Sequence, residues 1–202
     1  MNEICALAII PAKTDSKRIK CKNLRLIEGL TLVEHAIMYA QSSSYVKKII
    51  ITSESEEVRE ISQKYNSVYF YKRDNDYMGE REVADVYINV LQNDLSDYGH
   101  EAIIPEITHV VGIQPDHPDR ESNLDDLLEY AVSNKYDDLF TVDETGTRNG
   151  AVRIVKKDFV LSGIMSRRVG SFVDNCTNIH SEQDIIKAEI NIKKKKMNSY
   201  IE

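Results

Sequence analysis

The stretch ICALAIIPAKTDSKRIKCKNLR, residues 4–25, joins a short apolar run to a loop that is dense in cations. The apolar run, residues 4–10, predicts a strand buried on both faces, because such strands are continuously rather than alternately hydrophobic. Asp15 is the only acid among the six basic residues that follow: Lys13, Lys17, Arg18, Lys20, Lys22 and Arg25. A loop at the carboxyl end of such a strand lies where α/β sheets bind ligands.

Closely spaced ammonium and guanidinium groups repel one another unless an anion lies between them. A polyphosphate suits the arrangement, since Arg grips its oxygens as a fork and Lys acts as a point charge. The alternative from charge alone is a solvated basic loop on an acidic protein.

The composition of the chain argues against several other classes of protein. With 202 residues the chain has room for one full domain, and 42% apolar and 29% charged residues are typical of a globular protein. A net charge of −7 argues against non-specific nucleic-acid binding, so the basic loop is a local feature. The N-terminal residues do not resemble a signal peptide and no apolar stretch approaches 18 residues, so we expect no membrane span.

The three cysteines are an odd number without CxxC spacing: Cys5, Cys21 and Cys176. They predict neither a zinc site nor a disulfide framework. Reduced thiols are the simplest interpretation, which favours a cytoplasmic location.

Strand-like and helix-like segments alternate along the chain. Their alternation predicts right-handed crossovers and a mostly parallel sheet. The expected strands are residues 4–10, 47–53, 68–71, 108–113, 139–142 and 149–154, and the expected helices are residues 31–43, 55–66, 81–95, 123–132 and a final helix from residue 182.

The order of residues in the basic loop carries a specific resemblance. AIIPAKTDSKRIKCKN, residues 8–23, resembles the opening signature of the acylneuraminate (CMP-sialic acid) and CMP-Kdo cytidylyltransferases. Pro11-Ala12, Ser16-Lys17-Arg18-Ile19 and Lys22-Asn23 fall in register without a gap. The chain departs from that pattern at Lys13, where the family has Arg, and at Thr14 and Asp15, where it has two glycines.

Further segments resemble the same family in register. They are ITSESEEVREISQKY at 51–65, QPDHPDR at 114–120, NGAVRI at 149–154 and NIHSEQDIIKAE at 178–189. The family's long dimerisation arm is essentially absent between residues 143 and 149. The resemblance implies a homodimer, and the missing arm weakens that implication.

The resemblance implies a single α/β domain over residues 1–202, with a mostly parallel, mixed sheet flanked by helices, as in the half-Rossmann fold of nucleotide-sugar transferases. It also implies that the protein is a CTP-dependent cytidylyltransferase. The partners would be CTP and an acidic sugar, a sialic-acid-like nonulosonic or ulosonic acid. An anomeric hydroxyl would attack the α-phosphate in line, giving a CMP-sugar and pyrophosphate.

Residue roles also follow from the resemblance. The triphosphate would be held by Lys13, Lys17, Arg18 and Lys22 as catalytic cations. The nucleotide would contact Ala12, Ser16, Asn23, Arg73 and Asp85, and the sugar acid would contact Gln114, Arg120 and Asn149. For Arg73 a surface cation at a strand end, and for Asp85 a solvated helix residue, are the alternatives. Asp116 and His117 replace a small hydroxyl pair of the family, which indicates an altered acceptor pocket.

The resemblance further implies Mg²⁺ or another divalent cation. Asn178 and His180 occupy the places of the family's two metal-binding aspartates, and Asp174 lies four residues before Asn178. Mg²⁺ prefers carboxylate oxygen, so an amide oxygen is a weaker ligand and an imidazole a poor one. A second hypothesis is therefore a catalytically weak or inactive relative that binds nucleotide or sugar acid without transfer. An acid within metal reach of the basic loop would favour the enzyme.

Overall fold

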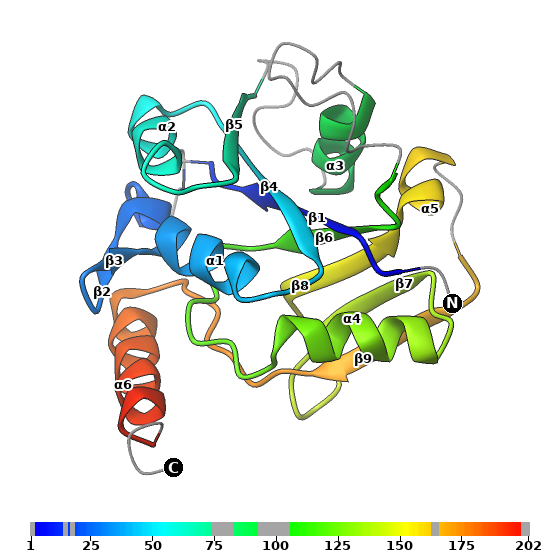
Figure 1. Cartoon of the computed structure of the whole chain (residues 1–202). Helices are drawn as coiled ribbons and strands as arrows, with labels where there is room; N and C mark the ends of the chain where they lie inside the picture. The colour runs from blue at the N-terminus through cyan, green and yellow to red at the C-terminus, as the bar shows by residue number, and fades with distance from the viewer. Residues whose placement is uncertain are drawn as a thin grey trace.

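The computed structural model describes residues 3–13, 16, 19–73, 83–92, 106–162 and 166–198. Seven of its strands form one mixed sheet in the order β5-β4-β1-β6-β8-β7-β9 (Figure 1). The strands are β1 (Ala6–Pro11), β4 (Val46–Ser53), β5 (Val68–Lys72), β6 (His109–Ile113), β7 (Asp138–Val142), β8 (Arg148–Lys156) and β9 (Val169–Val173). Within this sheet only β8 runs antiparallel to its neighbours. The predicted α/β fold with a mostly parallel, mixed sheet is confirmed.

Helices cover both faces of the sheet. They are α1 (Leu32–Gln41), α2 (Glu56–Ser62), α3 (Val83–Gln92), α4 (Leu124–Ser133), α5 (Lys157–Ser162) and α6 (Glu182–Asn198). Figure 1 shows α3 and α5 on the side of the sheet away from α1 and α4. Helix α6 packs instead beside the small β2–β3 hairpin (Leu26–Ile27 and Leu30–Thr31), where Ile27 and Ile192 share a separate apolar cluster.

Strand β1 lies at the centre of this arrangement. Ala6, Ala8 and Ile10 belong to the cluster under α1, α2 and α4, whereas Leu7 and Ile9 belong to the cluster under α3 and α5. All five side chains are fully buried. Successive side chains of a strand point to opposite faces, so a strand covered on both faces must be apolar throughout. This explains the unbroken hydrophobic run of the sequence.

Side-chain caps start the helices that flank the basic loop and the sheet edge. Thr31 and Glu34 form a capping box on α1, in which each side chain bonds the other's backbone N–H. Ser55 caps α2 by accepting from Val58 N, and Asn123 caps α4 by accepting from Asp125 N.

Three features were not predicted from the sequence: the β2–β3 hairpin, α5 and β9. The hairpin turn consists of Glu28 and Gly29, both with positive φ, 51° and 81°. Such a two-residue turn normally has Asn or Asp before the glycine. Because Glu28 occupies that position, the sequence did not indicate a turn here. The helix expected over 81–95 is described as Val83–Gln92, and its expected ends lie outside the described residues. Among the described residues, no helix is both long and apolar enough to cross a membrane.

Gly112 of β6 allows close packing against α3, and this contact gives a first prediction. A Cβ at Gly112 would lie 1.6 Å from the Tyr87 hydroxyl oxygen and 2.3 Å from its Cζ, and Tyr87 is buried. We expect Gly112→Ala to lower the free energy of unfolding by about 1–3 kcal/mol, the usual cost of overpacking a core. Denaturant unfolding measures this, and Gly112→Ala with Tyr87→Leu should recover part of the loss. A single variant as stable as wild type would contradict the packing described.

Candidate functional site at the carboxyl edge of the sheet

Four parallel strands end at the same edge of the sheet. Lys13 follows β1, Ser53 ends β4, Arg73 follows β5 and Gln114 follows β6. Three of the four, Lys13, Arg73 and Gln114, are predicted site residues, so the fold brings together positions spread over about a hundred residues of sequence. In open α/β sheets this edge is where ligands bind.

The basic loop is fastened to this edge at both ends. Ala12 N donates to Thr52 O at 2.9 Å, and Ser53 Oγ donates to Ala12 O at 2.6 Å. At the other end Asn23, which is buried in the short 3-10 helix η1 (Lys22–Leu24), donates from Nδ2 to Lys13 O at 2.7 Å. Asn23 therefore closes the loop, a role distinct from the nucleotide contact predicted for it.

The remaining loop residues are placed only in part. Ser16 is half-buried and Lys13 is exposed. Ile19 is buried in the cluster that contains Ile27 and Ile192, so this residue anchors the loop beside α6. Lys17 and Arg18, both predicted phosphate ligands, lie outside the described residues.

Lys22 joins three segments of the chain at one point. Its Nζ donates to Asp116 Oδ2 at 2.6 Å and to Ile179 O at 3.1 Å. Ile179 N in turn donates to Asp116 O at 2.9 Å. The side chains of Lys22 and Asp116 are only 15% and 22% exposed. The ammonium group is thus held in a fixed position beside the loop that follows β6.

The charge state of Asp116 follows from its neighbours. Burial by itself raises the pKa of Asp116, but His117 and Lys22 outweigh it and hold that pKa well below its usual range. His117 Nδ1 lies 3.0 Å from Asp116 Oδ1, and the His117 side chain is only 2% exposed. Neither ring nitrogen of His117 has a hydrogen-bond partner among the described residues, so its contact with Asp116 is electrostatic. Asp116 is therefore a carboxylate at neutral pH.

Arg73 and Asp85 were predicted to contact the nucleotide. Arg73 is buried, and its Nη2 donates to Thr52 O at 3.1 Å while its backbone N donates to Ser53 O at 3.0 Å. This fixes Arg73 beside the end of β4, so it is not the surface cation of the alternative interpretation. Asp85 is half-buried in the first turn of α3.

Gln114 and Arg120 were predicted to contact the sugar acid. Gln114 is half-buried, and no described residue bonds its side-chain amide. Arg120 is 7% exposed, donates from Nη2 to Gln114 O and stands 4.9 Å from the centre of the Tyr39 ring. Its Nε and Nη1 are buried without a hydrogen-bond partner among the described residues. Burial lowers the pKa of Arg120. A guanidinium in this state can donate hydrogen bonds to a further anionic or carbonyl group.

Asn149 uses its amide within the protein. Its Oδ1 accepts from Thr141 Oγ1 at 2.6 Å and from Ala151 N at 3.0 Å, and its Nδ2 donates to Asp174 O at 2.7 Å. These bonds tie β8 to β7 and to the segment after β9. The sugar contact predicted for Asn149 stays a prediction.

Of the three predicted metal ligands, only Asn178 has an oxygen that is buried without a hydrogen-bond partner among the described residues. Asp174 is buried, and its carboxylate accepts from Glu121 N at 2.9 Å and from Ser122 N and Oγ. His180 is exposed, whereas Asn178 Oδ1 is buried without a hydrogen-bond partner among the described residues. Within the described part of the chain, no three His, Cys, Asp or Glu side chains group as metal ligands. These residues alone do not fit a resident Mg²⁺, which needs hard oxygen ligands.

Asp116 lies at this edge of the sheet but was not among the predicted site residues. The sequence showed that Asp116 and His117 replace a small hydroxyl pair. Lys22 and Asp116 are 94 positions apart in the sequence, and only the fold brings their two loops together, so their ion pair was not predicted.

Residues 7–159 match the model of a protein family described as cytidylyltransferase. That segment includes the whole basic loop, the ends of β4, β5 and β6, and Asn149.

Individual relatives match shorter segments. The CMP-N,N'-diacetyllegionaminic acid synthase of Campylobacter jejuni is 36% identical over 75 residues, which are 37% of this chain and 32% of that protein. The pseudaminic acid cytidylyltransferase of Campylobacter jejuni is 33% identical over 98 residues, 46% of this chain and 42% of that protein. The chain thus matches less than half the length of either relative.

Among solved structures, a CMP:2-keto-3-deoxy-manno-octonic acid synthetase complexed with CTP has a TM-score of 0.70 and 13% identity. The superposition covers 95% of this chain and 99% of that one. At this identity the likeness bears on the fold alone.

Proposed function

Because the chain belongs to the cytidylyltransferase family, we propose that it transfers the CMP part of CTP to an acidic sugar and releases pyrophosphate. The acceptor would be a nonulosonic or ulosonic acid; the relatives from Campylobacter jejuni are named for N,N'-diacetyllegionaminic acid and pseudaminic acid. The observation that carries the proposal is Lys22, held by Asp116 and Ile179 beside a closed cationic loop at the carboxyl edge of the sheet.

The basic loop would hold the triphosphate. Lys13 and Lys22, with Lys17 and Arg18 of the same loop, supply the positive charge, and Ala12 and Ser16 lie beside them in sequence. Arg73, fixed at the end of β4, and Asp85 would contact the nucleoside part of CTP. Binding of this kind positions the α-phosphate and stabilises the charge that develops on it.

The loop after β6 would hold the sugar acid. Gln114 has both donor and acceptor capacity, which a polar sugar with a carboxylate requires. The unpartnered Nε and Nη1 of Arg120 supply donors nearby, because Arg120 already bonds the Gln114 carbonyl. An anomeric hydroxyl placed here would attack the α-phosphate in line. The new P–O bond forms as the bond from the α-phosphorus to the bridging oxygen breaks. Pyrophosphate leaves with that electron pair, and the hydroxyl proton passes to water.

A divalent cation belongs to the proposal as a partner of CTP. Mg²⁺ usually keeps several waters and binds through one or two protein oxygens together with substrate phosphates. Asn178, whose Oδ1 is buried without a partner among the described residues, is the predicted ligand that best fits that role. Asp174 and His180 remain predicted ligands, and the bonds from Glu121 and Ser122 to Asp174 favour a structural role for that carboxylate. The proposed activity would be cytoplasmic.

Calorimetry combined with a pyrophosphate assay tests this proposal. CTP is titrated into the protein with Mg²⁺ or Mn²⁺, and pyrophosphate release is then measured against a panel of nonulosonic and ulosonic acids. We expect CTP to bind and one acid to trigger release, whereas ATP, GTP and UTP give none. CTP binding without release over the panel would replace transfer by the binding-only hypothesis. Absence of CTP binding would overturn both.

A further inference from the structure

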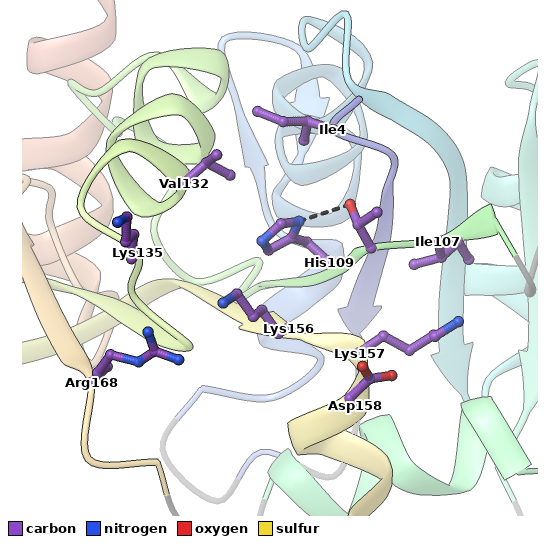
Figure 2. Close-up of a pocket in the computed structure, with 10 residues that line it drawn as sticks. Ile4, Ile107, His109, Val132, Lys135, Lys156, Lys157, Asp158 and Arg168 are labelled. Atoms are coloured by element: carbon purple, nitrogen blue, oxygen red, sulfur yellow. Dashed lines mark hydrogen bonds between the residues drawn. The ribbon is translucent and has the colours of Figure 1, made fainter. Parts of the chain in front are cut away.

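A second pocket lies at the opposite edge of the sheet. It has a volume of about 510 Å³ and lies where β1 and β6 begin, β8 ends and α5 starts (Figure 2). The candidate nucleotide site lies at the other ends of β1 and β6, so the sheet separates the two. A volume of this size is within the usual range for small-molecule sites, about 300–1,000 Å³.

The lining of this pocket combines apolar and cationic side chains. Ile4, Ile107 and Val132 supply apolar surface. The charged lining residues are Lys135, Lys156, Lys157, Arg168 and Asp158. Counting Asp137, which pairs with two of these cations, there are four positive and two negative charges. The pocket is thus locally positive on a chain whose net charge is −7.

Two of the cations are held in place by a buried acid. Lys156 Nζ lies 2.7 Å from Asp137 Oδ1 and Arg168 Nε lies 3.2 Å from Asp137 Oδ2, and the Asp137 side chain is 3% exposed. Arg168 donates to Asp137 through Nε, so its Nη1 and Nη2 can donate to another acceptor. Lys135 has no ion-pair partner among the described residues, and Figure 2 shows it with Arg168 on the same side of the pocket.

His109 gives an independent indication of a ligand. It lines the pocket, is 6% exposed, and its Nε2 has no hydrogen-bond partner among the described residues. Its Nδ1 lies 2.8 Å from Thr108 Oγ1 (Figure 2). Burial, with a contribution from Lys156, lowers the pKa of His109 to about 4, so the ring is neutral at pH 7.

The surroundings of Thr108 allow Nε2 to become a donor. Thr108 Oγ1 accepts from Cys5 N, and its single proton can go either to Cys5 O or to His109 Nδ1. Cys5 O also accepts from Thr108 N at 2.8 Å and His109 N at 3.2 Å, so it keeps donors when the hydroxyl turns to the ring. The ring then carries its proton on Nε2, an N–H donor for an anion.

We propose that this pocket binds a small phosphate-bearing ligand with an apolar body, as a second site separate from that for CTP. The phosphoryl group would lie among His109 Nε2, Lys135, Lys156 and Arg168, since Arg forks and Lys point charges both suit phosphate oxygens. The apolar body would pack on Ile4, Ile107 and Val132. The apolar surface beside the cations sets the expected ligand apart from free phosphate.

Phenyl phosphate and inorganic phosphate are the probes for this site. Each is titrated into the full chain, with calorimetry for affinity and imidazole-detected ¹H–¹⁵N NMR for the tautomer of His109. We expect phenyl phosphate to bind at least fivefold more tightly than inorganic phosphate and to move the His109 signal to the Nε2–H form. Saturating CTP and the variant Lys22→Met should leave this binding unchanged, because both act at the other edge.

Variants test whether phenyl phosphate binds in this pocket. Lys135→Gln should weaken phenyl phosphate binding about tenfold or more, the loss of one charge-assisted contact. His109→Leu should weaken it by a similar factor, and Lys194→Gln on the exposed side of α6 is the matched control. Should His109→Leu fail to fold, Lys135→Gln and the NMR signal still decide. Wild-type affinity in Lys135→Gln, displacement by CTP, or an unmoved His109 signal would each overturn the proposal.

Discussion

Replacing Lys22 with methionine is expected to lower kcat/KM for CTP by roughly 10–10²-fold, the loss of one or two charge-assisted hydrogen bonds to phosphate. The physical reason is twofold. The change removes an ammonium that Asp116 and Ile179 hold beside the basic loop, and it leaves Asp116 Oδ2 without its lysine partner next to the triphosphate. Methionine keeps most of the volume of the lysine stem. Steady-state kinetics with varied CTP measures the effect.

Asp116→Asn separates the two contributions. The amide oxygen can still accept from Lys22, so we expect a smaller loss, about tenfold at most, in line with one weakened bond. The double variant should be no worse than Lys22→Met alone, because the two residues act as a pair. Lys64→Met, at an exposed position after α2, controls for the loss of one positive charge. Equal kinetics for Lys22→Met and Lys64→Met would contradict the role given to Lys22.

Asp119→Ala is expected to destabilise the fold strongly. The Asp119 side chain is 2% exposed and accepts from Thr177 N at 2.8 Å, Thr177 Oγ1 at 2.7 Å and Asn191 Nδ2 at 2.8 Å. These bonds tie the loop after β6 to the segment before α6 and to α6 itself. A hydrogen bond to a charged group contributes about 1.5–3 kcal/mol, and the three are not additive, so we expect a loss of about 3–5 kcal/mol.

Thermal unfolding measures that loss. For a chain of this size about 1 kcal/mol shifts Tm by roughly 2–4 °C, so Asp119→Ala should lower Tm by roughly 6–20 °C. Asp119→Asn keeps one acceptor and should fall between this variant and wild type. Asp126→Ala changes an exposed acid in the first turn of α4 and should cost only a few tenths of a kcal/mol. A Tm for Asp119→Ala within a degree of that control would contradict the linking role of Asp119.

Regular elements were predictable where local pattern and burial agree. The continuous run of β1 predicted a strand covered on both faces, and β4 followed from the same reasoning. Helix α5 has six residues with one buried side chain, Val160, too few for a period to emerge. Strand β9 is mostly exposed, so its sequence lacks the apolar alternation of a half-covered strand.

The site was predictable only in part, for a physical reason. The basic loop is contiguous, so its cations and its resemblance to a known signature could be read directly. The pair of Lys22 with Asp116 and the closure of the loop by Asn23 depend on tertiary contacts that no local pattern encodes. The hydrogen bonds to Asp174 from Glu121 and Ser122 likewise appear only when β9 is placed beside β7.

The most direct test of the central claim is ³¹P NMR of a reaction containing the protein, CTP, Mg²⁺ and a nonulosonic acid. Transfer predicts loss of the three CTP signals, and growth of pyrophosphate and one CMP phosphodiester signal in equal amounts. Lys22→Met should slow both products together. CTP signals that persist with every acid of the panel, or conversion to CDP and inorganic phosphate, would contradict the proposed transfer of CMP.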